Sequence, residues 1–257
     1  MKSCKVRAPA KLILSGEHAV VYGTPALAMA VDRYAETTVL SSKNQDDVQF
    51  DIKSLSHSKK MTYRALRDLK STLKDKYRRF QSGQLSIGGI LKTPLQLAHF
   101  TAINAFDRVK EKMSGLHLHI DANIPNGCGM GSSAALAVSM TYAIAQFYEL
   151  DLSEADFIEL AQDAEKLQHG FPSGLDVLTS LRGGTLLFQK GQAVTHDTPT
   201  FPLYLVNTGK PQSSTGETVV AVKKSFENSP IWQDFEATTL SMSRAIQDNN
   251  LDAFKRA

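Results

Sequence analysis

Residues 124–135 read Ile-Pro-Asn-Gly-Cys-Gly-Met-Gly-Ser-Ser-Ala-Ala, and this stretch decides how the rest of the chain is interpreted. We expect a strand to end near Ile124 and a strongly apolar helix to begin at about Ser132. The three glycines between them lack a Cβ and can adopt positive φ, so their N–H groups can converge on an anion. The helix N-terminus adds free N–H donors and a positive dipole end. Together these features predict a phosphate-binding loop.

Two better-known phosphate loops do not fit this stretch. No Gly-Lys-Ser/Thr follows the glycines, as it would in a Walker motif. The GxGxG spacing differs from the GxGxxG of dinucleotide-binding folds, and no acidic residue closes a βαβ unit about twenty residues later. The remaining alternative is a glycine-rich turn that only packs a helix against a strand.

Periodicity gives a coarse map of the elements around the loop. Apolar leucines at helical spacing predict a helix with a basic face over 59–80, and Ser153 with Asp156 forms a capping-box pattern that starts a helix running to about Gln168. The other expected strands are 4–7, 11–15, 25–40, 116–121, 183–188 and 202–207, the other expected helices are 95–113, 218–226 and 235–247, and 169–176 is expected to be a loop.

Strand 116–121 places His117 and His119 on the same face, because alternate residues of a strand share a face. Such a pair could bind a metal ion. No third ligand lies near them in the sequence, so a structural role is favoured.

The bulk composition is that of a globular protein. Of 257 residues, 42% are hydrophobic and 21% charged, and the net charge of +3 is too small to indicate nucleic-acid binding. Two cysteines make no disulfide scaffold and indicate a reducing compartment. No apolar run is long enough for a signal sequence or membrane span. We therefore expect a soluble cytoplasmic protein with no nucleic-acid or membrane partner.

The loop resembles the phosphate loop PxxxGLGSSAA of the GHMP kinases, with Met130 in place of the usual leucine. Residues 8–23, APAKLILSGEHAVVYG, resemble the N-terminal signature of the mevalonate kinase branch. Glu165 and the segment 169–176, HGFPSGLD, resemble a third motif of that branch. Ser214-Thr215 resembles a weaker fourth motif, in which Gly216 replaces a basic residue. The matches run in family order from residue 8 to about 219.

The resemblance implies an α+β, two-lobed GHMP kinase fold. The N-terminal lobe, similar to domain 2 of ribosomal protein S5, would comprise residues 1–170, and a smaller C-terminal α/β lobe would comprise residues 171–257. A third glycine-rich motif like GAGGGG does not appear before Ala257. We therefore expect a C-terminal lobe that is incomplete, either because the chain is truncated or because the motif is lost.

The resemblance also implies the roles of individual residues. Asp176 would be the catalytic base, since an ordinary aspartate is ionised at neutral pH, and Lys11 would offset developing negative charge. Ser133 and Glu165 would hold Mg²⁺. Glu17, His18 and Thr215 would line the substrate pocket. The nucleotide loop would comprise Pro125, Asn126, Gly127, Cys128, Gly129, Met130, Gly131, Ser132 and Ser133.

The implied reaction uses ATP and Mg²⁺ to phosphorylate (R)-mevalonate at its 5-hydroxyl, and the resemblance leaves a homodimer open. Each role has a plainer alternative: an exposed helix glutamate at 165, a helix cap at Asp176, a solvated lysine at 11 and a structural histidine at 18. Two rival functions remain. One is a GHMP kinase for another acceptor, such as phosphomevalonate or a sugar, and the other is a catalytically silent binding protein with the same fold.

Overall fold

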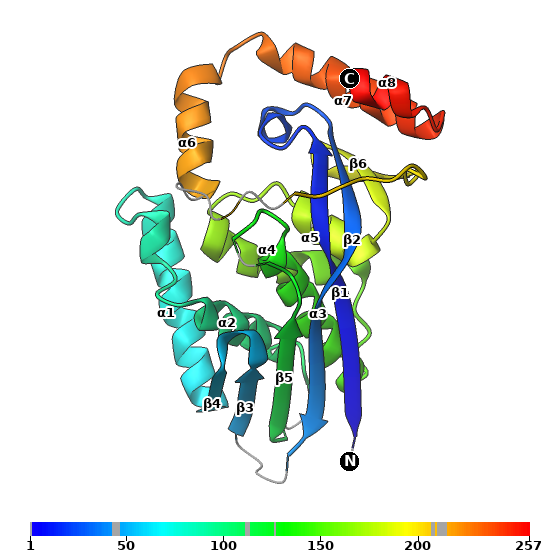
Figure 1. Cartoon of the computed structure of the whole chain (residues 1–257). Coiled ribbons are helices and arrows are strands. Elements are labelled where there is room, and N and C mark those ends of the chain that lie inside the picture. Colours follow the sequence, from blue (N-terminus) through cyan, green and yellow to red (C-terminus); the bar gives the residue numbers. More distant parts are fainter. Residues whose placement is uncertain (1, 43–46, 111–113, 126, 207–208, 210–214) are drawn as a thin grey trace.

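A computed structural model describes residues 2–42, 47–110, 114–125, 127–206, 209 and 215–257 (Figure 1). Two predicted site residues fall outside it: Asn126 lies outside the described residues, and so does the side chain of Thr215. Within the described part of the chain, no helix is both long and apolar enough to cross a membrane.

The framework is one seven-stranded sheet, with strand order β4-β3-β5-β2-β6-β7 and with β1 paired to β2. All pairs are antiparallel except β3 with β5, which run parallel. The strands are β1 (Ser3–Ser15), β2 (Ala26–Ser41), β3 (Asp47–Ile52), β4 (His57–Thr62), β5 (Leu116–Ala122), β6 (Thr185–Gln189) and β7 (Gln192–His196).

Strand β1 unites two segments that the sequence analysis separated at Pro9. Its register against β2 shifts between Pro9 and Ala10, where the proline sits opposite Tyr34. Proline lacks an N–H to donate, so an irregularity in the pairing at this position is expected. The long strand places Lys11 opposite Ala30 of β2.

Most helices cover one face of the sheet, and those of the C-terminal part lie beyond the end of β1 (Figure 1). The helices are α1 (Tyr63–Gln81), α2 (Pro94–Phe106), α3 (Ser132–Phe147), α4 (Glu154–His169), α5 (Leu175–Arg182), α6 (Thr215–Phe226), α7 (Ile231–Gln247) and α8 (Leu251–Arg256). Side chains from α2 and α3, such as Ile103 and Ile144, pack with Phe50 and Leu118 of the sheet into the main core. The capping box of Ser153 and Asp156 is confirmed at the start of α4.

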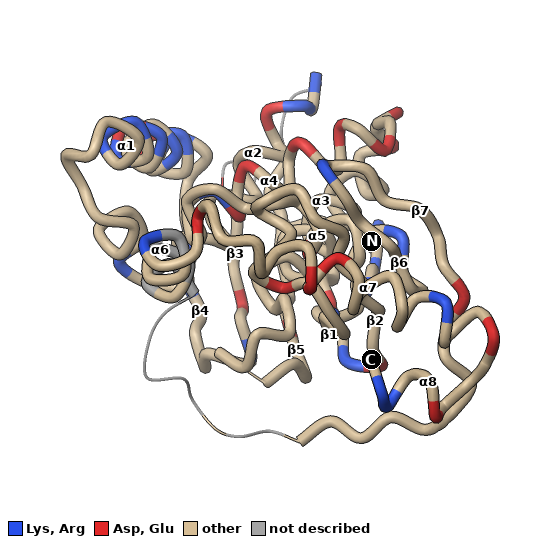
Figure 2. Tube along the Cα trace, turned by 90° about the horizontal axis from the view of Figure 1, so that it is seen from above, with Lys and Arg blue, Asp and Glu red and all other residues tan. Residues whose placement is uncertain are grey.

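Most predicted elements are confirmed, with boundaries shifted. The expected helix over 59–80 is wrong for its first four residues, because 59–62 pair with β3 as part of β4. Leu66 and Leu73 of α1 are buried as predicted, and Figure 2 shows lysine and arginine residues along α1. Helix α2 ends at Phe106 rather than at 113.

The strand predicted at 202–207 is wrong over its described part. Residues 202–206 have no strand structure, and Tyr204 and Val206 are largely exposed. An apolar run forms a strand only where a neighbouring strand accepts its hydrogen bonds, and none is described for this segment. The predicted loop 169–176 is shorter than expected because α5 begins at Leu175.

The C-terminal helices contact the end of β1. Ser15 Oγ lies 2.7 Å from Thr239 Oγ1 of α7, and the rings of Tyr22 and Trp232 stack with centroids 4.1 Å apart. Strands β6 and β7, which follow residue 170, join the same sheet as β1–β5. The lobe boundary at residue 170 stays a prediction.

Candidate active site

Strand β1 is attached directly to the glycine loop. The backbone N–H of Lys11 donates to the carbonyl of Met130 over 3.0 Å. Gly131, the next residue, adopts φ +66°, and a Cβ built there would lie 2.9 Å from Lys11 Cγ. The lysine side chain therefore packs against the loop at the point where only glycine leaves room for it.

An ion pair between a buried lysine and a partly exposed aspartate joins β1 to α5. Lys11 Nζ lies 3.3 Å from Asp176 Oδ1, and the exposed fractions of the two side chains are 4% and 31%. Gly174 precedes the helix with φ +92°, and Asp176 occupies the first turn, where a carboxylate is favoured by the helix dipole. The structure thus brings together the two residues predicted to be catalytic, although they lie far apart in the sequence.

The glycine loop has the geometry expected of an anion-binding loop. Gly127, Gly129 and Gly131 all have positive φ, and a Cβ at Gly127 or Gly129 would meet no described atom within 4 Å. Helix α3 begins at Ser132 with no side-chain cap, so its first N–H groups are not satisfied by a capping side chain. Of the other predicted loop residues, Pro125 is exposed, Cys128 and Ser132 are partly buried, and Met130 and Ser133 are buried.

Glu165 lies beneath the loop and is almost fully buried. Burial raises its pKa to about 8, with a further contribution from Asp176, while a hydrogen bond from Ser133 and the charge of Lys11 lower it. Short distances also link Glu165 to the loop, because His169 Nε2 lies 3.6 Å from Glu165 Oε2 and 3.4 Å from Ser133 Oγ. The structure therefore joins the predicted metal ligands, Ser133 and Glu165, to the predicted catalytic pair.

The Glu165 site fits a hard divalent cation. Oε1 is buried and has no hydrogen-bond partner in the described part of the structure, and an unpaired buried carboxylate oxygen is costly. Carboxylate and hydroxyl oxygens are ligands that Mg²⁺ accepts. Glu165 and Ser133 are the residues that would hold the ion.

His169 is a member of the cluster to which the sequence analysis gave no role. Its Nε2 lies 3.4 Å from Ser133 Oγ and 3.6 Å from Glu165 Oε2. Burial lowers the pKa of this histidine, which favours a neutral imidazole beside the buried carboxyl group. The sequence analysis missed this role because it ended the helix at about Gln168, whereas α4 extends to His169 and so places it four residues after Glu165 on the same face.

The predicted substrate residues are less closely tied to the cluster. Glu17 is exposed and His18 is partly buried in the turn between β1 and the short helix Ala19–Tyr22. The described hydrogen bonds and ion pairs do not connect either side chain to Lys11 or Asp176. Thr215 begins α6, and nothing is described of its side chain. The substrate-pocket assignment of these three residues stays a prediction.

Comparison with known proteins agrees with this geometry. The model for the N-terminal domain of GHMP kinases matches residues 99–184, which include the loop, Glu165 and Asp176. A mevalonate kinase of Thermococcus sibiricus is 32% identical over 248 residues, covering 93% of this chain and 67% of the relative. This chain belongs to the GHMP kinase family.

A second relative and a solved structure agree with this result, the structure through its fold alone. A mevalonate kinase of Pyrococcus abyssi is 31% identical over 229 residues, 87% of this chain and 62% of the relative. The crystal structure of the Methanococcus jannaschii mevalonate kinase superposes with a TM-score of 0.77 at 22% identity and covers 98% of this chain and 76% of that protein. The expected GHMP kinase fold is confirmed. The chain spans about two thirds of the length of the first two relatives.

Proposed function

We propose that this GHMP kinase transfers the terminal phosphoryl group of ATP to a hydroxyl group of a small molecule, and that the acceptor is the 5-hydroxyl of (R)-mevalonate. The observation that carries the proposal is the contact of Lys11 with both Asp176 and Gly131. A carboxylate and a cation beside a glycine loop are the groups that a hydroxyl-directed phosphoryl transfer requires, which supports the proposal.

The chain's residues have distinct tasks in this reaction. Bound ATP supplies the phosphoryl group, and Mg²⁺ neutralises part of its charge. The glycine loop and the first turn of α3 hold the phosphates through backbone N–H groups. Ser133 and Glu165 hold the cation. These groups position the reactants and stabilise charge, which is most of what phosphoryl transfer requires of a protein.

Asp176 and Lys11 handle the acceptor. As the hydroxyl oxygen forms its bond to phosphorus, its proton passes to the Asp176 carboxylate, and the bond from phosphorus to the leaving oxygen of the nucleotide breaks. The Lys11 ammonium, 3.3 Å from Asp176 Oδ1, stabilises negative charge that develops on the acceptor oxygen. Because Lys11 is buried, its charge acts in a medium of low dielectric constant, where it is more effective than in water.

The choice of mevalonate rests on the N-terminal motif and on the relatives. Residues 16–23, GEHAVVYG, match the mevalonate kinase branch, and the two relatives described above are mevalonate kinases. The surroundings of Glu17 and His18 would contribute to the acceptor pocket. We also propose a cytoplasmic location, because two cysteines in 257 residues are typical of a protein from a reducing compartment.

The test is a coupled assay for ADP release with a panel of acceptors. We expect turnover with (R)-mevalonate, and little with phosphomevalonate or galactose. Turnover with one of the other acceptors alone would overturn the choice of mevalonate and leave a GHMP kinase of different specificity. Calorimetric binding of ATP without ADP release for any acceptor would contradict the kinase proposal and indicate a binding protein.

A further inference from the structure

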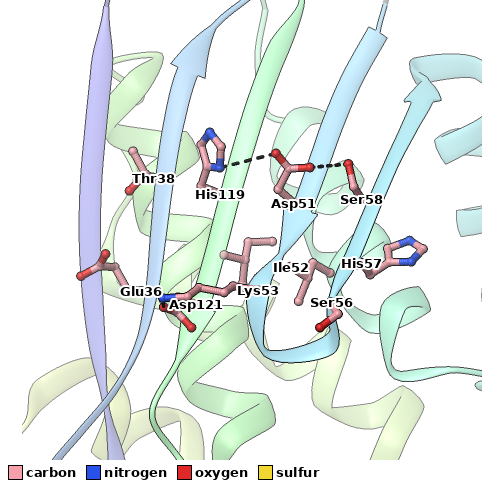
Figure 3. A pocket seen from close by; sticks show the side chains of 11 residues that line it. Glu36, Thr38, Asp51, Ile52, Lys53, Ser56, His57, Ser58, His119 and Asp121 are labelled. Carbon is pink, nitrogen blue, oxygen red and sulfur yellow. Dashed lines mark hydrogen bonds and ion pairs between the residues drawn. The ribbon is translucent and has the colours of Figure 1, made fainter.

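A second cluster of chemically active side chains lies on the face of the sheet that the helices leave open. Core residues such as Phe50, Leu118 and Ile120 point toward the helices. Because alternate residues of a strand point to opposite faces, Asp51, His117 and His119 point away from them. Asp51 and His119 line a pocket of about 540 Å³, which is shown in Figure 3. His117 contacts Asp51 beside this pocket.

We propose that Asp51, His117 and His119 form a site for a divalent transition-metal ion of the zinc class. Their ligand atoms all lie within 4.8 Å of one another. The third ligand was absent from the sequence analysis because it comes from β3, which pairs with β5 so that Asp51 is opposite His119.

The positions of the atoms suit a shared ion. Asp51 Oδ2 contacts His117 Nε2 and lies 3.6 Å from His119 Nδ1. The centroids of the two imidazole rings are 3.9 Å apart. A tetrahedral zinc ion with bonds of about 2.1 Å separates its ligand atoms by roughly 3.4 Å. Small side-chain rotations therefore convert the present contacts into a coordination shell. Its fourth position would face the pocket, where water can occupy it.

Neighbouring side chains orient the carboxylate as they would in a metal site. Ser58 Oγ donates to Asp51 Oδ1 over 2.6 Å, and Gln49 Nε2 donates to the same oxygen over 3.0 Å. These contacts leave Oδ2 free to face His119, which Figure 3 shows beside it, and His117. Metal-binding carboxylates are commonly fixed by such hydrogen bonds.

The charges around the pocket single out Asp51. Of the carboxylates that line it, Glu36 pairs with Lys5 and Arg7, and Asp121 pairs with Lys53. The described ion pairs of Asp51 are with the two histidines alone. A histidine balances a carboxylate only when it is protonated, whereas a divalent cation balances it with both imidazoles neutral. Imidazole ligands favour Zn²⁺ over Mg²⁺, so this site differs in preference from the one at Glu165.

The experiment measures zinc binding to the whole protein after treatment with a chelator. Calorimetry with Zn²⁺ is expected to show one equivalent bound, and Co²⁺ in its place to give the visible absorption of a tetrahedral complex. Asp51→Asn and His119→Gln should each weaken Zn²⁺ binding by about 100-fold or more, and Ser58→Ala by about 10-fold, because removing an outer hydrogen bond typically costs 10–100-fold.

Two control variants make the result specific. Asp121→Asn removes a carboxylate from the same pocket and should leave Zn²⁺ affinity unchanged. Glu165→Gln should also leave it unchanged, which excludes binding at the candidate active site. Absence of Zn²⁺ binding in the unaltered protein, or equal affinity in Asp51→Asn and Asp121→Asn, would overturn the proposal. The readout is metal binding, so it does not depend on any kinase activity. If either Asp51→Asn or His119→Gln fails to fold, the other variant still tests the site.

Discussion

The ammonium group of Lys11 is buried while its partner, the carboxylate of Asp176, stays partly open to solvent, at 4% and 31% side-chain exposure. This asymmetry predicts different results when either partner is removed. A buried charge that loses its partner cannot recover its hydration, but a partly exposed charge can.

Replacing Asp176 by asparagine should therefore impair both activity and stability. We expect kcat to fall on the order of 10³-fold, because the base is lost. The free energy of unfolding should fall by roughly 2 kcal/mol, because Lys11 is left buried without its carboxylate. Steady-state kinetics and urea unfolding measure the two effects.

Lys11→Met is the companion variant. It should slow turnover on the order of 10²-fold or more, because the transition state loses a cation. Its stability should change little, since methionine fills the buried volume and Asp176 can hydrate. A larger loss of stability in Lys11→Met than in Asp176→Asn would show that this account of the pair is wrong.

Gly131 and Gly129 form a matched pair for testing the contact between the loop and Lys11. Both have φ near +70°, but only a Cβ at Gly131 would approach Lys11, at 2.9 Å from Cγ. Gly129→Ala should reduce stability by about 1 kcal/mol through backbone strain alone. Gly131→Ala should lose clearly more in urea unfolding, and should also reduce kcat by displacing the lysine. Equal losses would contradict the contact.

Glu165→Gln tests the cation site. The change retains size and burial but removes the charge that would bind Mg²⁺, so the Mg²⁺ concentration for half-maximal rate should rise by about 10-fold or more. Glu159, on the same helix, pairs with Arg108 near the surface, and Glu159→Gln should have no such effect. An unchanged Mg²⁺ requirement in Glu165→Gln would remove this residue from the site.

His99 should make the protein less stable in mild acid. Burial, together with the nearby cations Lys59 and His57, lowers its pKa to about 4, against about 6.5 in an unfolded chain. The unfolded state binds the additional proton between these values, so stability is full above about pH 6.5 and decreases as the pH falls toward 4. The whole difference is about 3 kcal/mol.

The variant His99→Leu should remove this part of the pH dependence. It also removes a buried Nε2 that has no hydrogen-bond partner among the described residues. Urea unfolding at several pH values between 4 and 7 would measure the slope. His196→Gln, at a histidine that contacts Ser243, should keep the slope of the unaltered protein. An unchanged slope in His99→Leu would place the acid sensitivity elsewhere.

The sequence predicted the features whose causes are local. The glycines before Ser132, the capping box at Ser153 and the burial of Leu66 and Leu73 follow from neighbouring residues, and all are present. The family resemblance supplied the catalytic roles of Lys11 and Asp176, and the structure shows that the two side chains form an ion pair.

What the sequence could not predict depends on partners distant in the chain. Residues 59–62 extend as a strand because β3 lies beside them, although their lysines continue the basic pattern of α1. Asp51 meets His119 only because β3 and β5 pair in parallel across an intervening helical segment. The apolar run at 202–206 had the composition of a strand but has no described neighbour to pair with.

The hydrogen bond from the Lys11 backbone to Met130 has a consequence for motion. It ties the strand that carries Lys11 to the glycine loop, so the two segments move together. The distance between the strand and the loop is therefore preserved. The backbone of this part of the candidate site therefore needs no rearrangement before a nucleotide binds. Any rearrangement on binding would involve the ligands and segments of the chain other than β1 and the loop.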